Sequence, residues 1–207
     1  MINGVREDKV NKLLNDLKGR VIRAIVIGTS TGGPKALDEI ITKLPRDIGV
    51  PIFVVQHMAE DMIKTFVTRL NKKSDITVKE AEHGERIRKN IVYIAKGNYH
   101  MEVSNLDKII LNKDETVHGV RPAVDNLFKS CAKVYRDSLL SIVLTGMGKD
   151  GAAGTLEVKN KGGYCIVQSE ESCLIYGMPK AAFNTGAVDL SLDIDIMADV
   201  IVKSIKK

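Results

Sequence analysis

Apolar and polar positions follow two alternating patterns along most of the chain. Short runs rich in Val, Ile and Leu are nearly continuous, as expected of parallel strands buried on both faces. Between them, apolar residues recur at the spacing of helices that cover a sheet. Strands are predicted at 21–27, 51–56, 75–81, 139–145, 164–168 and 187–192. Helices are predicted at 34–44, 60–72, 122–136, 151–161, 178–185 and 194–205. This alternation predicts a three-layer, doubly wound, Rossmann-like α/β domain with a mostly parallel sheet.

One internal segment departs from this alternation. Residues 92–95, 101–103 and 108–111 form three short apolar runs separated by turn residues. Strands linked by short turns pair with each other more readily than with distant strands. We therefore expect a hairpin inserted at the edge of the sheet.

The first 20 residues differ in composition from the rest. They are polar, but four apolar residues share helical spacing: Val10, Leu13, Leu14 and Leu17. This segment is interpreted either as a short helix that docks on the domain or as a linker. We divide the chain into residues 1–20 and an α/β domain at residues 21–207.

Composition and charge narrow the function classes. The chain has 207 residues and a net charge of +5, and its basic residues are spread along the sequence. Aromatic residues make up 4% and Trp is absent, so nucleic-acid binding through base stacking is not expected. No apolar run reaches the roughly 20 residues of a membrane span. The three cysteines lack metal-ligand spacing and are expected to be free buried thiols in the cytoplasm.

Three residues suited to nucleophilic catalysis follow predicted strands. Ser30 stands in a Gly-x-Ser-x-Gly turn after the first strand, His57 follows the second and Asp150 follows the fourth. The carboxyl ends of parallel strands meet at one edge of an open sheet, where ligands bind. A Ser-His-Asp set is therefore expected there, although a helix cap or a phosphate-binding turn stays open for Ser30. The chain order Ser, His, Asp differs from that of α/β-hydrolases.

A dinucleotide site is the main alternative from the residues alone. Gly146-x-Gly148-x-x-Gly151 follows a predicted strand and opens a helix, and two glutamates lie about 20 residues further on. Asp150 is expected at that helix N-terminus, where its carboxylate would repel a pyrophosphate.

The remaining histidines show no metal-ligand pattern. His83, His100 and His118 form no H-x-x-x-H pair, and surface loops are the favoured position for each. We expect neither a metal nor a cofactor.

Several motifs together resemble the catalytic domain of the CheB-type chemotaxis methylesterases. The matching pieces occur in the family's order between residues 21 and about 192. They are Ile27-Gly28-Thr29-Ser30-Thr31-Gly32-Gly33-Pro34, Gln56-His57-Met58, Gly84-Glu85-Arg86, Arg121-Pro122-x-Val124-Asp125, Leu144-Thr145-Gly146-Met147-Gly148-x-Asp150-Gly151-Ala152-x-Gly154 and Tyr176-Gly177-Met178-Pro179.

The resemblance implies a function and a site. Members remove methyl esters from glutamates of chemoreceptors, and some deamidate receptor glutamines, without a metal or cofactor. It implies the triad Ser30, His57 and Asp150. It also implies an oxyanion hole formed by the backbone N–H groups of Thr31 and Met147. The expected partner is the helical bundle of a methylated chemoreceptor, with no membrane insertion.

Two points of the resemblance leave alternatives open. Family members usually carry an N-terminal receiver domain that residues 1–20 are too short to form. The chain is therefore expected to be either a stand-alone member or a catalytic fragment of a longer protein, and a separate receiver or signalling protein stays open as a partner. A non-catalytic module that binds receptors also stays open. The cleft rim is expected at Tyr176-Gly177-Met178 and in the loop around His100. Ala59 and Lys96 replace prolines common in the family, near the expected rim.

Overall fold

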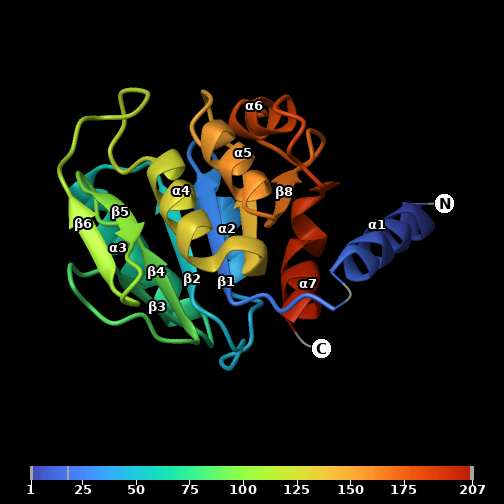
Figure 1. The fold of residues 1–207 in the computed structure, drawn as a ribbon, viewed down its shortest axis with the longest axis horizontal. Coiled ribbons are helices and arrows are strands. Elements are labelled where there is room, and N and C mark those ends of the chain that lie inside the picture. Colours follow the sequence, from blue (N-terminus) through green and yellow to red (C-terminus); the bar gives the residue numbers. More distant parts are fainter. Residues whose placement is uncertain (1, 18, 206–207) are drawn as a thin grey trace.

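The computed structural model describes residues 2–17 and 19–205 and is built around one parallel sheet (Figure 1). Seven strands lie in the order β3-β4-β2-β1-β7-β8-β9, and every neighbouring pair is parallel. They are β1 (Ala24–Thr29), β2 (Ile52–Gln56), β3 (Thr77–Glu80), β4 (Ile91–Ile94), β7 (Leu139–Val143), β8 (Tyr164–Gln168) and β9 (Leu190–Leu192). The predicted α/β architecture is confirmed.

Helices cover both faces of the sheet and create two hydrophobic cores. One face carries α1 (Ile2–Asp16), α2 (Gly33–Ile41), α3 (Glu60–Lys73) and α7 (Ile194–Ile205). The other carries α4 (Val124–Tyr135), α5 (Ala152–Asn160) and α6 (Met178–Phe183), and the 3-10 turn η1 (Arg136–Ser138) follows α4. Along β1, Ile25 and Ile27 enter the first core while Ala24 and Val26 enter the second. Burial on both faces is the reason why the strand sequences are continuously apolar.

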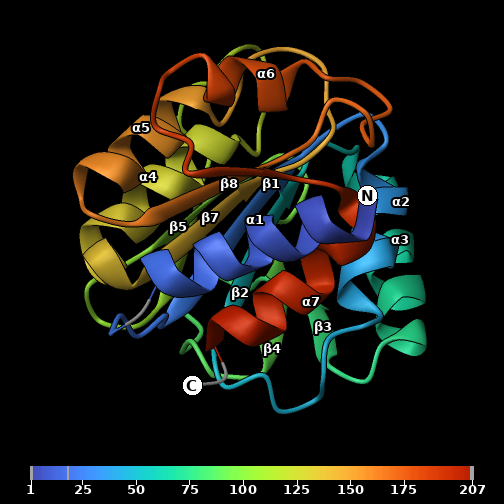
Figure 2. The same ribbon diagram turned by 90° about the vertical axis from the view of Figure 1, so that its right-hand side faces the viewer.

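Helix α1 lies against the first core. Figure 2 shows it running beside α7. Leu13 and Leu17 are fully buried, and the Tyr164 hydroxyl donates a hydrogen bond to Asp16 at 3.0 Å. These contacts account for the helical spacing of leucines in the first 20 residues, whereas the domain division at residue 21 stays a prediction. No helix within the described ranges is both long and apolar enough to cross a membrane.

Two predictions about strands were wrong. The run at 92–95 does not belong to an edge hairpin, because β4 lies inside the parallel sheet between β3 and β2. Only β5 (His100–Val103) and β6 (Ile109–Asn112) form a hairpin, and it is a separate antiparallel sheet that packs on α4. Sequence proximity suggested pairing among all three runs, but β4 is apolar enough to be buried on both faces. The first strand also begins at Ala24 rather than at Val21, whose side chain is 70% exposed.

The order of the strands creates a crevice at the carboxyl edge of the sheet. From β1 the chain passes through α2 to β2 on one side, whereas from β7 it passes through α5 to β8 on the other. Helices α2 and α5 cover opposite faces, so the ends of the adjacent strands β1 and β7 are left uncovered between them. Ligands bind at such a reversal of strand order in open α/β sheets.

Candidate active site

Ser30 occupies the sharp turn between β1 and α2. Its N–H donates to the Thr145 carbonyl at 3.1 Å, and its own carbonyl accepts from Gln56 Nε2 at 3.0 Å. Gly32 has a φ of +85°, a left-handed conformation that a glycine adopts without strain, and Pro34 lies in the first turn of α2. The strand ends on both sides therefore hold the Ser30 backbone at the open edge of the sheet.

The turn after β7 approaches Ser30 closely. A Cβ added to Gly146 would lie 2.8 Å from Ser30 Cβ and would also collide with Sδ of Met178. Real side chains cannot tolerate such a contact, so glycine is required at this position. The Ser30 side chain consequently lies against the turn at 146–151, which also carries Asp150.

His57 and Asp150 form a direct hydrogen bond. The His57 N–H continues the β2 pairing by donating to the Thr29 carbonyl at 3.1 Å. His57 Nε2 lies 2.8 Å from Asp150 Oδ2, and the two side chains are only 12% and 3% exposed. Because a carboxylate only accepts hydrogen bonds, Nε2 carries the proton and Nδ1 of the neutral imidazole is left as a base.

Asp150 is held in its ionised form by the start of α4. Oδ2 accepts a second hydrogen bond from the Val124 N–H at 2.7 Å, and Oδ1 accepts one from the Asp125 N–H at 2.9 Å. Burial alone raises the pKa of Asp150, but the hydrogen bonds from His57 and from these two backbone groups outweigh it, so the pKa lies below the usual value. The positive end of the α4 dipole acts in the same direction.

The start of α5 is occupied by a different carboxylate from the one predicted. The N–H groups of Gly151 and Gly154 donate to Asp125 Oδ1 at 3.0 and 2.7 Å. Asp150 precedes α5 in sequence, but its side chain turns toward α4, so the expectation that it blocks the α5 N-terminus was wrong. Asp125 blocks it instead, because its carboxylate occupies two of the backbone donors to which the pyrophosphate of a dinucleotide would bind.

Three potential metal ligands lie close together near this point. One ligand atom from each of His118, Asp125 and Asp150 falls within 4.8 Å of the others. His118 Nε2 lies 3.1 Å from Asp125 Oδ2, and every other carboxylate oxygen of the group also accepts an N–H. The donor set is therefore saturated by hydrogen bonds, which is the chemistry of a structural network and not of an open cation site.

The backbone N–H groups of Thr31 and Met147 are available to a ligand. Among the residues that the structure describes, none accepts a hydrogen bond from either group. Thr145 fixes the loops around them, because its Oγ1 donates to the Thr31 carbonyl at 3.0 Å and accepts the Ile175 N–H at 3.0 Å. Both N–H groups thus lie in segments that adjoin Ser30 and are held in place.

Gln56 is a site residue to which the sequence analysis assigned no role. Its Nε2 donates to the carbonyls of both Ser30 and His57, the latter at 2.9 Å, so one side chain joins the two segments. The sequence signal was its place in the Gln56-His57-Met58 motif. Asp125 likewise belongs to a motif, Arg121-Pro122-x-Val124-Asp125, but the sequence analysis assigned it no role.

The structure corrects one of the three histidine predictions. His100 is fully buried, with Nε2 3.0 Å from the Glu115 carbonyl and Nδ1 accepting the Ala123 N–H at 3.1 Å. It joins the β5–β6 hairpin to the start of α4, and because it is buried it does not contribute to the rim of the cleft. His83 and His118 lie in exposed loops, as predicted.

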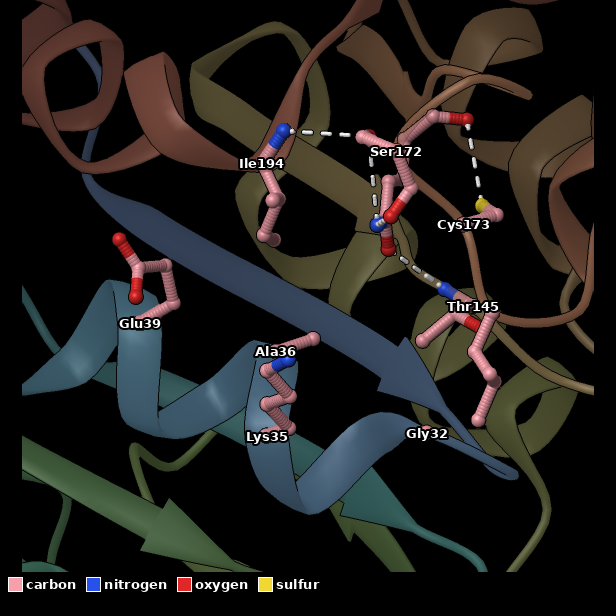
Figure 3. Close-up of a pocket in the computed structure, with 10 residues that line it drawn as sticks. Gly32, Lys35, Ala36, Glu39, Thr145, Ser172, Cys173 and Ile194 are labelled. Atoms are coloured by element: carbon pink, nitrogen blue, oxygen red, sulfur yellow. Dashed lines mark hydrogen bonds between the residues drawn. The ribbon is translucent and has the colours of Figure 1, made fainter.

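The predicted rim at 176–178 is also partly wrong, since Met178 is buried against Gly146. A hollow of about 340 Å³ lies instead beside Gly32, between α2 and the segment at 172–174 (Figure 3). Ala36, Leu174 and Ile194 contribute apolar surface to it, and Lys35 and Glu39 contribute charged groups. It adjoins the Ser30 turn, although Ser30 itself does not line it.

Comparison with known proteins decides the family. The sequence model described as CheB methylesterase matches residues 25–201. The chain belongs to the CheB methylesterase family. A solved structure, the Thermotoga maritima CheB methylesterase catalytic domain, superposes with a TM-score of 0.85 at 39% identity, covering 88% of this chain and 98% of that one.

Relatives in the CheB methylesterase family are longer than this chain. A Clostridium acetobutylicum protein named protein-glutamate methylesterase/protein-glutamine glutaminase is 53% identical over 99% of this chain and 58% of its own length. A Pyrococcus horikoshii protein of the same name is 40% identical over 98% of this chain and 55% of its own length. The chain thus spans somewhat more than half of each relative.

Proposed function

We propose that the chain is a serine hydrolase that removes methyl esters from glutamyl side chains of chemoreceptors. The observation that carries the proposal is the 2.8 Å hydrogen bond between His57 Nε2 and Asp150 Oδ2, beside the glycine-rich turn of Ser30. A histidine oriented by a buried carboxylate at the same sheet edge as a serine on a strand-to-helix turn is the arrangement that serine hydrolysis requires. Membership of the CheB methylesterase family supports the same conclusion.

In the proposed reaction, Ser30 Oγ attacks the ester carbonyl while His57 Nδ1 takes the hydroxyl proton. Asp150 keeps Nε2 protonated and stabilises the imidazolium that forms. The tetrahedral intermediate then breaks its bond to the methoxy group, which leaves as methanol with the proton from His57. A water molecule, deprotonated by the same histidine, hydrolyses the acyl-enzyme and releases the glutamate.

The N–H groups of Thr31 and Met147 are proposed to bind the oxyanion. Their lack of acceptors among the described residues supports this role, because an oxyanion hole needs donors that are free before the substrate arrives. Each such donor contributes about 3 kcal/mol to transition-state stabilisation in other enzymes. The mechanism uses residues of the chain alone.

The proposed substrate is a side chain that projects from a helix of the receptor bundle. Gly32, which lines the hollow, lies two positions after Ser30, and we propose that the hollow receives an apolar side chain that flanks the ester. The relatives' names include protein-glutamine glutaminase, so we also propose deamidation of receptor glutamines, in which ammonia replaces methanol as leaving group. A separate receiver or signalling protein remains a proposed second partner.

The proposed location is the cytoplasm. Cys131, Cys165 and Cys173 are all free thiols, as expected in a reducing compartment. Burial raises the pKa of Cys165 and of Cys173 to about 12, which keeps both sulfurs protonated and unreactive. Cys173 is only part-buried, in contrast to the expectation for all three.

Methanol release from methylated receptor membranes tests the proposal. The intact chain is expected to release methanol and the Ser30→Ala variant is not. Ser138→Ala, at the opposite end of β7, is the matched control and should retain full activity. Equal release by the intact chain and by Ser30→Ala would rule out Ser30 as nucleophile. No release by the intact chain would favour a non-catalytic receptor-binding module.

A further inference from the structure

A second buried carboxylate lies directly behind the first. Asp125 is 1% exposed and belongs to the first turn of α4, whereas Asp150 is 2% exposed and precedes Gly151, the N-cap residue of α5. The proposed reaction gives Asp125 no role. Its backbone N–H nevertheless donates to the Asp150 carboxylate, and its own carboxylate accepts hydrogen bonds from the turn that follows Asp150.

The two carboxylates cap each other's helices. Asp150 accepts the Val124 and Asp125 N–H groups at the start of α4, and Asp125 accepts the Gly151 and Gly154 N–H groups at the start of α5. Each side chain therefore satisfies donors that a helix leaves unpaired. The backbone of Asp125 also binds the carboxylate of Asp150, so the pair is interlocked.

The interlock depends on a close approach of the two helices. A Cβ on Gly154 would lie 2.6 Å from Phe128 Cβ and 3.2 Å from Asp125 Oδ1, so only a glycine lets α5 pack this near α4. Gly151 has a φ of +93°, which turns the chain directly after Asp150. The short turn that carries Asp150 is thus fastened on its α5 side by Asp125.

His118 fastens the other oxygen of Asp125. Its Nε2 lies 3.1 Å from Asp125 Oδ2, and its side chain is 32% exposed. The Asp150 carboxylate lies next to this pair and accepts the Asp125 N–H, and His57 in turn is hydrogen-bonded to Asp150. A continuous chain of hydrogen bonds therefore leads from an exposed loop to the proposed general base.

We propose that Asp125, supported by His118, is a positioning residue that sets the orientation of Asp150 and thereby of His57. The expected effect on kcat rests on the proposed function, whereas the orientation of Asp150 and His57 by Asp125 does not. Without Asp125 Oδ1, the donors of Gly151 and Gly154 lose their acceptor and the turn can shift. A displacement of about 1 Å in a catalytic group can reduce the rate by about 100-fold.

Two substitutions at one position separate positioning from charge. In Asp125→Ala both backbone donors are unpaired, and kcat for methanol release is expected to fall about 10- to 100-fold while KM stays within about two-fold. In Asp125→Asn the amide oxygen still accepts both donors, so kcat should stay within about three-fold of the intact chain. Asp114→Ala, at an exposed position in the loop that precedes α4, is the control and should change neither parameter.

A second readout does not need activity. The His57 Nε2–H proton, which lies in the hydrogen bond to Asp150, is observed by proton NMR in the intact chain and in each variant. Asp125→Ala should move this resonance upfield or broaden it, because a misplaced Asp150 accepts the proton less well. Asp125→Asn should leave the resonance near that of the intact chain, a rescue that helix stability alone does not predict.

The outcomes are distinguishable from failure of the proposed function. If the intact chain releases no methanol, the proposed function fails, while the His57 Nε2–H resonance still decides the positioning role. A folded Asp125→Ala variant with unchanged kcat and an unchanged resonance overturns the inference, and so do equal losses in the Ala and Asn variants. If Asp125→Ala does not fold, His118→Ala replaces it, with an expected loss of about three-fold in kcat at constant KM. An unchanged kcat in that variant overturns the inference.

Discussion

Replacing Asp150 with Asn tests the hydrogen bonds that hold the proposed base. The carboxylate accepts at both oxygens, from His57 and Val124 at Oδ2 and from Asp125 at Oδ1. An amide has one oxygen and one NH₂ group. Whichever way the amide is turned, its NH₂ faces a backbone N–H at the start of α4, and two donors cannot bond to each other.

The cost can be worked out from these contacts. A buried N–H without an acceptor costs about 1–3 kcal/mol, and losing the negative charge at the α4 N-terminus costs about 0.3–1 kcal/mol. Removing a buried charge recovers part of its desolvation. We therefore expect the free energy of unfolding of Asp150→Asn to be lower by about 1–3 kcal/mol.

The effect on catalysis is expected to be much larger than the effect on stability. If the Asn NH₂ faces His57 Nε2, that nitrogen must accept, and the proton moves to Nδ1. Nδ1 then cannot take the proton of Ser30. Loss of the correct tautomer in another Ser-His-Asp triad lowered kcat about 10⁴-fold, and a similar fall is expected here.

Urea unfolding and methanol release measure the two effects on the same preparation. Asp114→Asn, an exposed aspartate, is the control and should match the intact chain in both assays. A decrease of less than about 0.5 kcal/mol in the free energy of unfolding would refute the prediction that the substitution leaves a buried N–H without an acceptor. Retention of kcat within about ten-fold would refute the role of Asp150 in orienting His57.

Three further predictions concern other parts of the molecule. Gly146→Ala should lower kcat at least about 100-fold, because its Cβ would lie 2.8 Å from Ser30 Cβ and displace the serine; steady-state kinetics check this. Leu13→Ala should lower the free energy of unfolding by about 2–5 kcal/mol in urea titrations, whereas the exposed Asn11→Ala should not. The lowered pKa of Asp150 means that its stabilising contribution is complete above its unfolded value of about 3.9 and is lost as the pH falls through the folded value. Urea midpoints measured from pH 7 down to pH 3 should therefore fall less steeply in Asp150→Asn than in the intact chain.

The sequence by itself determined the class of the fold and the edge at which the site lies. The continuous apolar runs require strands buried on both faces, and alternation with helices then implies a parallel sheet whose carboxyl ends meet. That reasoning brought Ser30, His57 and Asp150 to one edge. It needed only local periodicity and the identity of the residue after each strand.

Tertiary structure decided what the sequence pattern left ambiguous. Local spacing grouped β4 with the hairpin and assigned Asp150 to the start of α5, yet β4 pairs inside the sheet and Asp150 turns to α4. His100 was predicted to lie in a surface loop, whereas in the fold it is buried and accepts a hydrogen bond from the Ala123 N–H at the start of α4. The partners in these cases come from segments far apart in the chain, as with His57 and Asp150, which are 93 positions apart. The periodicity of apolar residues indicates which face of a helix or strand is buried. The choice between competing hydrogen-bond partners depends instead on how helices and strands pack, and this packing is specified only in the folded chain.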